Sequence, residues 1–163
     1  MHADAIIAIA AAKNGERLTQ KIFGGEIGWV PWQRPGFDLG LKVGAMTTGD
    51  PKLNGLVLGS HGLVTWADDS RACYRTTLRI IQKAAEWLTE NGKPEPFGAE
   101  VARALPEADR RALLGAIAPE LRGLLSPLQG KLMHHVDSPA VLEFVDSARC
   151  EELARRGTTC PDE

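Results

Sequence analysis

The 163-residue sequence has few of the residues on which common kinds of site are built. It contains four histidines, three cysteines and one tyrosine, and it has no CxxC pair, no HExxH motif and no glycine-rich phosphate loop. Its formal net charge is −2 and its pI is near 6.1. Because such a chain lacks the basic surface that holds a phosphate backbone or an anionic membrane, we expect no nucleic-acid or membrane partner.

Long hydrophobic runs are also missing. The most apolar stretch, residues 5–12, is far shorter than the roughly 20 residues that span a bilayer. Asp4 precedes it, where a secretion signal would carry positive charge. The odd number of cysteines, with no paired spacing, suits a reducing compartment. We therefore expect a cytoplasmic protein.

The apolar pattern predicts an α/β fold. Helical spacing predicts helices over residues 4–13, with Asp4 as N-cap, 16–23, 37–45 and from the cap Asp68-Asp69 to a left-handed stop at Asn91-Gly92. Short apolar runs predict strands over residues 26–32, 56–58 and 63–66. Strands that alternate with amphipathic helices favour a layered architecture over a helical bundle.

The second half of the chain is predicted to be mainly helical. Residues 93–96 are interpreted as a connector, and helices are expected over residues 99–105, 107–125 and 150–156, the second containing Pro119. Residues 131–136 are predicted as a strand, whereas residues 141–145 fit a strand or a helix. We therefore divide the chain into a core, residues 1–92, and a helical extension of the same domain, residues 93–163.

His61 is the histidine best placed for chemistry. It lies in the turn Gly59-Ser60-His61-Gly62 between two predicted strands, where a sheet end holds a side chain rigidly and Gly62 permits a close approach of backbone or ligand. By pattern alone, however, a hairpin histidine is more often structural. His2 precedes a helix, whose dipole favours the neutral, metal-binding imidazole, although a frayed terminal residue is the more common case.

The other candidates are weaker. His134 and His135 would point to opposite faces of a strand, so we interpret them as structural. Arg34, between Trp32 and Pro35, could bind a phosphate or carboxylate bidentately, although charged turn residues are usually only solvated.

Several stretches together resemble the class II aldolase/adducin family. Residues 59–66 resemble a family segment in which an apolar strand is followed by His-Gly, a second apolar strand and Trp. The histidine of that segment is the family's third metal ligand. Residues 1–11 resemble the segment where a His-x-His-Pro-Asp motif enters a helix. Residues 28–37, 137–145 and 157–162 resemble the aldolase portion of bifunctional rhamnulose-1-phosphate aldolase/alcohol dehydrogenases.

The resemblance implies a layered α/β/α domain with an incomplete sheet and a zinc ion held by three histidines, two of them His2 and His61. Such an ion stabilises the negative charge that develops as a carbon–carbon bond breaks. The implied reaction cleaves rhamnulose 1-phosphate, a sugar-phosphate substrate, to dihydroxyacetone phosphate and lactaldehyde. Arg34 is the candidate for binding the phosphate.

The departures from the family pattern are equally informative. Ala3 stands in place of the usual proline, and the first histidine of the motif and the acidic general base would both precede Met1. We therefore expect a fragment of a longer enzyme that alone binds zinc weakly and turns over poorly or not at all. Its uncovered sheet edge predicts a homo-oligomer. A non-catalytic adducin-like interaction module or relic, and a sugar-phosphate 4-epimerase, remain alternatives.

Overall fold

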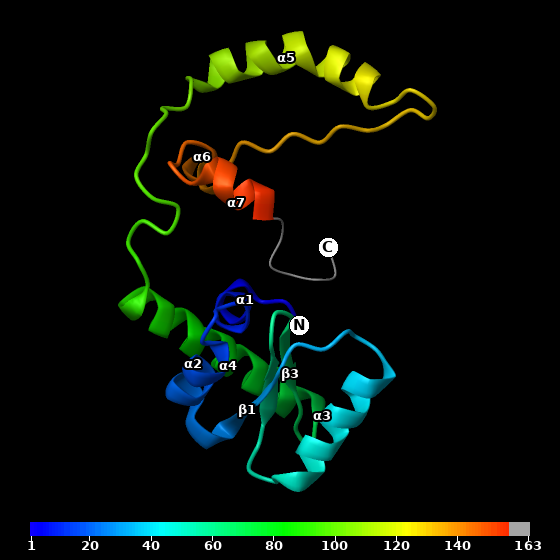
Figure 1. The fold of residues 1–163 in the computed structure, drawn as a ribbon, viewed down its shortest axis with the longest axis vertical. Helices are drawn as coiled ribbons and strands as arrows, with labels where there is room; N and C mark the ends of the chain where they lie inside the picture. Colours follow the sequence, from blue (N-terminus) through cyan, green and yellow to red (C-terminus); the bar gives the residue numbers. More distant parts are fainter. Residues whose placement is uncertain (157–163) are drawn as a thin grey trace. The chain divides into compact units, whose positions relative to one another are not determined.

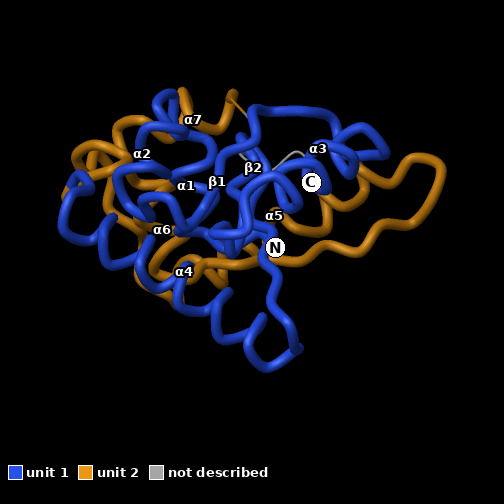
Figure 2. The backbone as a smooth tube through the Cα atoms, turned by 90° about the horizontal axis from the view of Figure 1, so that it is seen from below, with its two compact units in different colours: residues 1–93, 158–163 blue, residues 94–157 orange. Residues whose placement is uncertain are grey.

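The protein is described by a computed structural model that covers residues 1–156. It forms two compact units, one of residues Met1–Lys93 and one that starts at Pro94, shown in blue and orange in Figure 2. Within the described residues, none of the helices combines the length and the apolar character that crossing a bilayer requires. Cys160 and the segment 157–162, which carries part of the family resemblance, lie outside the described residues.

The first unit is built on a mixed three-stranded sheet. Strand β1 (Ile27–Val30) pairs in parallel with β2 (Gly55–Leu58), and β2 pairs in antiparallel fashion with β3 (Gly62–Thr65). The order β1-β2-β3 puts β2 in the centre, where all four of its residues are buried. Helices surround this sheet: α1 (Asp4–Ala10), α2 (Gly15–Phe23), the 3-10 turn η1 (Gly24–Glu26), α3 (Phe37–Gly49) and α4 (Ser70–Asn91).

Helices α1, α2 and α4 cover one face of the sheet (Figure 1). Side chains alternate between the two faces of a strand, so Ile27 and Val57 both face these helices. They form one hydrophobic cluster with residues from the helices, among them Ile6, Ile9 and Ile80, whose side chains are fully buried.

Helix α3 packs on the opposite face. Val30, Leu56 and Leu58 form the second hydrophobic cluster there, together with Leu53. Leu39, Val43 and Met46 of α3 lie against this cluster and are half-buried. The unit therefore has the three layers α/β/α that the sequence predicts.

An ion pair joins α4 to the start of β1. Arg79 donates to both carboxylate oxygens of Glu26, and the Asn54 side chain donates to the same carboxylate at 3.2 Å. The hydrogen bond to Arg79 is the main reason why the pKa of Glu26 lies below its ordinary value of 4.5. Because Glu26 precedes β1, this contact stabilises the end of the sheet at which β1 and β2 begin.

The second unit contains α5 (Glu107–Leu124), α6 (Pro139–Val145) and α7 (Cys150–Arg156). The segment after Pro94 is attached to the α6–α7 connection by an isolated β-bridge between Glu100 and Ser147. Phe97 and Phe144 meet edge to face, with ring centroids 5.2 Å apart. This unit is mainly helical, as predicted.

Four local predictions are wrong. Ala3, not Asp4, is the N-cap of α1, which ends at Ala10. Gly92 has φ −72°, so α4 does not end in the left-handed conformation. Residues 99–105 form no helix, and residues 131–136 form no strand. Residues 141–145, for which the pattern fitted either structure, are helical.

Candidate functional site

The loops that follow β1 and β2 leave the sheet at the same end, because the two strands are parallel. The backbone N–H of Gly59 donates to the carbonyl of Val30 at 2.8 Å, which joins the two loops where they leave the sheet. The first loop, residues 31–36, carries Arg34, and the second carries His61. Two candidate residues, predicted from separate parts of the sequence, therefore lie on loops at the same end of the sheet.

The turn that carries His61 is held by backbone hydrogen bonds. The N–H of His61 donates to Leu58 O at 3.0 Å, and the N–H of Ser60 donates to Ala10 O at 2.9 Å, at the end of α1. Ser60 has φ +53°, a left-handed conformation that a non-glycine residue adopts only when its surroundings impose it. The turn is thus fixed by both β2 and α1.

Trp29 supports the same turn from the face of the sheet that α1, α2 and α4 cover. An added Cβ at Gly59 would lie 2.9 Å from the Trp29 ring, and one at Gly15 would lie 2.7 Å from it. The half-buried indole therefore fills the space between the start of α2 and the His61 turn, and it fits only because both neighbours are glycine.

His2 reaches His61 through a short pairing of the chain terminus with β3. The Met1 amino group donates to Leu63 O at 3.0 Å, and the Leu63 N–H donates to Met1 O at 3.0 Å. The imidazole rings of His2 and His61 then meet edge to face, with centroids 5.0 Å apart and planes at 63°. His2 is exposed and His61 is half-buried, so the pair is open to solvent on one side.

This separation suits two ligands of one ion. Two imidazoles bound tetrahedrally to one zinc ion, with Zn–N distances of about 2.0–2.1 Å, have ring centroids roughly 5 Å apart. The donor set and its spacing therefore fit a divalent metal as two ligands. Within residues 1–156, however, no group of three or more His, Cys, Asp or Glu side chains is arranged to hold a metal ion.

The loop of Arg34 holds a second polar residue, Gln33, which no sequence pattern singled out. The side-chain oxygen of Gln33 is buried, and no donor among the described residues reaches it. The neighbouring Arg34 side chain is exposed. An acceptor and a cation thus lie side by side in the loop next to the His61 turn, and both could meet a polar ligand.

His134 and His135 do not join the histidine pair. They lie in the second unit and line a hollow of about 330 Å³ together with Arg110 and apolar residues of α5. Both side chains are exposed. Their interpretation as structural residues stays a prediction.

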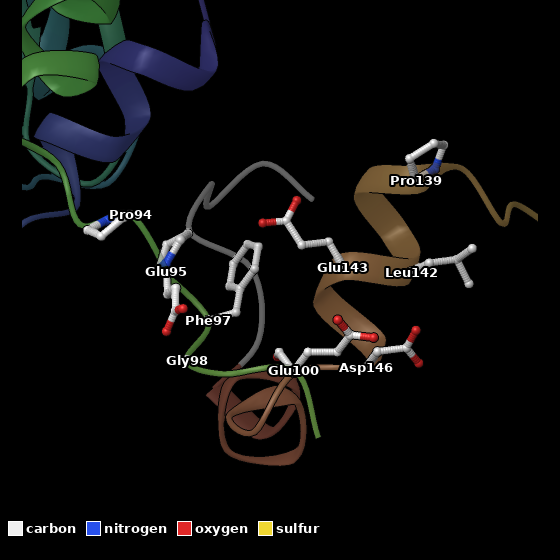
Figure 3. Close-up of a pocket in the computed structure, with 11 residues that line it drawn as sticks. Pro94, Glu95, Phe97, Gly98, Glu100, Pro139, Leu142, Glu143 and Asp146 are labelled. Carbon is white, nitrogen blue, oxygen red and sulfur yellow. The ribbon is translucent and has the colours of Figure 1, made fainter. Parts of the chain in front are cut away.

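A cavity of about 380 Å³ in the second unit has a different character (Figure 3). Among the described residues, four carboxylates line it, from Glu95, Glu100, Glu143 and Asp146, beside the ring of Phe97. Within residues 1–156, no lysine or arginine lines it. Because carboxylates and a phosphate are both negatively charged and repel at close range, this cavity is a poor site for a sugar phosphate. The end of the sheet that carries His61 and Arg34 remains the better candidate.

Comparison with known proteins gives a family match for both halves of the chain. The family model for the class II aldolase and adducin N-terminal domain matches residues 1–89, and that for the second domain of class II aldolases matches residues 112–163. The uncharacterized oxidoreductase YuxG of Bacillus subtilis (strain 168) is 36% identical over 162 residues, or 99% of this chain. The chain spans 24% of that relative's length.

One solved structure is also similar, the N-terminal class II aldolase domain of a conserved protein from Thermoplasma acidophilum. It is 31% identical to this chain and has a TM-score of 0.47 over 53% of this chain and 39% of its own. The N-terminal family model alone matches more than half of the sequence and contains both members of the histidine pair. The chain belongs to the class II aldolase/adducin family.

Proposed function

We propose that this chain is part of a zinc-dependent aldolase that cleaves a ketose 1-phosphate, rhamnulose 1-phosphate, to dihydroxyacetone phosphate and lactaldehyde. The observation that carries the proposal is the pair of His2 and His61, whose rings meet 5.0 Å apart. Class II aldolases typically use a divalent metal, and imidazole is a ligand that zinc prefers.

In this proposal each of the four candidate residues at this end of the sheet has one role. His2 and His61 hold the ion, which when bound would stabilise the negative charge that develops as the carbon–carbon bond breaks. Arg34 binds the substrate phosphate, for which its planar guanidinium is suited. The buried oxygen of Gln33 accepts a hydrogen bond from a substrate hydroxyl, which would give this acceptor the donor that no described residue supplies.

The name of the long relative supports a two-part enzyme. YuxG is described as an oxidoreductase, yet the quarter of it that this chain matches belongs to an aldolase family. An aldolase joined to an alcohol dehydrogenase accounts for both descriptions. The segments at residues 28–37 and 137–145, which resemble such bifunctional enzymes, favour rhamnulose 1-phosphate as the substrate.

Exposed leucines and free cysteines support the remaining expectations. Leucines 124, 128 and 132 are at least 70% exposed, which supports a homo-oligomer in which such side chains are covered. Cys73 and Cys150 are free thiols, in agreement with a cytoplasmic protein. Light scattering at several protein concentrations tests the first of these proposals, and a monomer at all of them would overturn it.

One experiment decides between the enzyme and its alternatives. The wild-type chain, His61→Ala and the control His134→Ala are assayed for retro-aldol cleavage of rhamnulose 1-phosphate with added zinc, and their metal content is measured. We expect metal binding, and any cleavage that the chain achieves alone, to fall in His61→Ala and to persist in His134→Ala, because only His61 belongs to the pair. Measurable cleavage at the same rate in wild type and His61→Ala, or equal metal content in the two, would end the aldolase proposal.

The described residues also favour a second candidate, a non-catalytic interaction module, because they hold no group of three metal ligands. This alternative predicts purified protein without stoichiometric metal and without any cleavage. A sugar-phosphate 4-epimerase would instead interconvert epimeric substrates without breaking a carbon–carbon bond. The same assay distinguishes all three outcomes by its products.

A further inference from the structure

Gly62 has no conformational need to be glycine. It is the first residue of β3, and it is not among the described residues with positive φ, whereas Ser60 in the same turn has φ +53°. Any residue could adopt the Gly62 backbone conformation. The reason for a glycine at this position must therefore lie in what surrounds it.

The surroundings of Gly62 are the first two residues of the chain. An added Cβ would lie 2.5 Å from Met1 O and 3.0 Å from Cδ2 of the His2 ring. The first distance is shorter than a carbon and a carbonyl oxygen can tolerate, and the second already requires the ring to move. Gly62 thus leaves open the space through which Met1 and His2 pass along β3.

We propose that Gly62 is a positioning residue, whose missing side chain lets Met1 pair with β3 and thereby holds the His2 ring against His61. The inference rests on the proposed metal site, since it assigns to Gly62 the assembly of that site. It accounts for three observations together: the two Met1–Leu63 hydrogen bonds, the His2 ring beside the place that a Gly62 side chain would occupy, and the meeting of the two rings.

A methyl group at Gly62 would displace the terminus and leave the strand in place. Strand β3 is paired with β2 along its whole length, and Leu63 is only 2% exposed. Met1 is 63% exposed and is held to β3 by its two hydrogen bonds with Leu63. Because the less constrained partner moves, Gly62→Ala should release Met1 and His2 while the sheet keeps its register.

The test uses four variants of the full chain, which are Gly62→Ala, His2→Ala, the double variant and Gly44→Ala. Gly44 lies in α3, where an added Cβ meets nothing within 4 Å, so Gly44→Ala controls for a generic loss of glycine. Two readouts need no metal. They are the nuclear Overhauser contact between the His2 and His61 ring protons, and the hydrogen-exchange rate of the Leu63 amide. The third readout is Co²⁺ affinity, followed by visible absorption.

We expect Gly62→Ala to lose the ring contact and to exchange the Leu63 amide faster, while Gly44→Ala keeps both as in wild type. Changing a residue that orients a metal ligand should weaken Co²⁺ binding on the order of 10–100-fold. Since Gly62→Ala acts only through the ligand that His2→Ala removes, the double variant should bind no more weakly than His2→Ala alone. Additive losses would show that Gly62 acts by another route.

The outcomes separate this inference from the proposed function. If wild type shows the ring contact and Gly62→Ala retains it, the inference is overturned, whatever the metal does. If the contact is lost in Gly62→Ala but wild type binds no Co²⁺, Gly62 positions His2 while the metal site itself is disproved. Should Gly62→Ala fail to fold, wild type still decides, because rapid exchange of the Leu63 amide would exclude the Met1 pairing on which the inference depends.

Discussion

Adding a divalent metal ion should stabilise one of the two units and leave the other unchanged. His2 and His61 both lie in the unit Met1–Lys93. All four tryptophans lie in this unit as well, at positions 29, 32, 66 and 87. Tryptophan fluorescence therefore follows the unfolding of the histidine-containing unit alone, whereas far-ultraviolet circular dichroism follows the helices of both units.

The size of the unit sets the expected shift. A ligand that binds only the folded state adds about 2.7 kcal/mol to the free energy of unfolding at about 100 times its Kd. For a folding unit of roughly 60–100 residues, each kcal/mol raises Tm by about 4–8 °C. Zinc at this concentration should therefore raise the Tm seen by fluorescence by about 11–22 °C.

The controls make this prediction refutable. His61→Ala should lose most of the shift because it removes one of the two rings, and His134→Ala should keep it, since that residue lies in the second unit. The dichroism transition of the second unit should not move. Equal shifts in wild type and His61→Ala, or a parallel shift of both units, would show that zinc acts without the histidine pair.

Three further predictions concern the scaffold. Ile80→Ala removes a fully buried side chain and should lower the free energy of unfolding by about 2–5 kcal/mol. Urea denaturation followed by fluorescence measures this loss, and no measurable loss would contradict the packing of α4 on the sheet. Asp69→Ala removes the carboxylate that accepts from Ala72 N at 2.8 Å and should cost about 0.5–2 kcal/mol, largely restored in Asp69→Asn. Glu26→Gln should cost at most about 1 kcal/mol, because Arg79 is 51% exposed. Since folding lowers the pKa of Glu26, that difference should be full above the ordinary value of 4.5 and vanish as pH falls through the folded pKa; a difference that does not change with pH would disprove the role of the ion pair.

Local signals in the sequence predicted the first unit well. The longest helix and its cap at Asp69 are confirmed, because capping depends on residues three apart in the chain and on little else. The strands on either side of the His61 turn are confirmed too, since their apolar runs are bounded by turn residues on both sides. In the second unit, helix α7 begins at Cys150, where its pattern predicts.

The errors in the second unit arise where partners distant in sequence decide the structure. The N–H groups of Val101 and Ala102 donate to Asp146 O, so the segment pairs with a distant loop although its composition favours a helix. Residues 131–136 are predicted as a strand but have no partner strand among the described residues, and Leu132 is 100% exposed. A strand without a pairing partner is not stable in water.

The candidate site was predictable only in part. His61 could be selected from its turn, because that turn is a local feature. The proximity of His2 depends on the pairing of Met1 with β3, which no local pattern encodes, and only the family resemblance linked the two histidines. The close approach of backbone to Gly62, expected from the sequence, is confirmed, and the approaching backbone is that of Met1.

The pairing of Met1 with β3 has a practical consequence for producing this protein. The amino group that donates to Leu63 is the α-amine of the first residue, so a purification tag fused in front of it turns a charged donor into a peptide N–H. The added residues must also leave along the edge of the sheet, next to the two imidazoles. A polyhistidine tag placed there would supply foreign ligands to the same ion, and metal measurements on such a preparation would report on the tag.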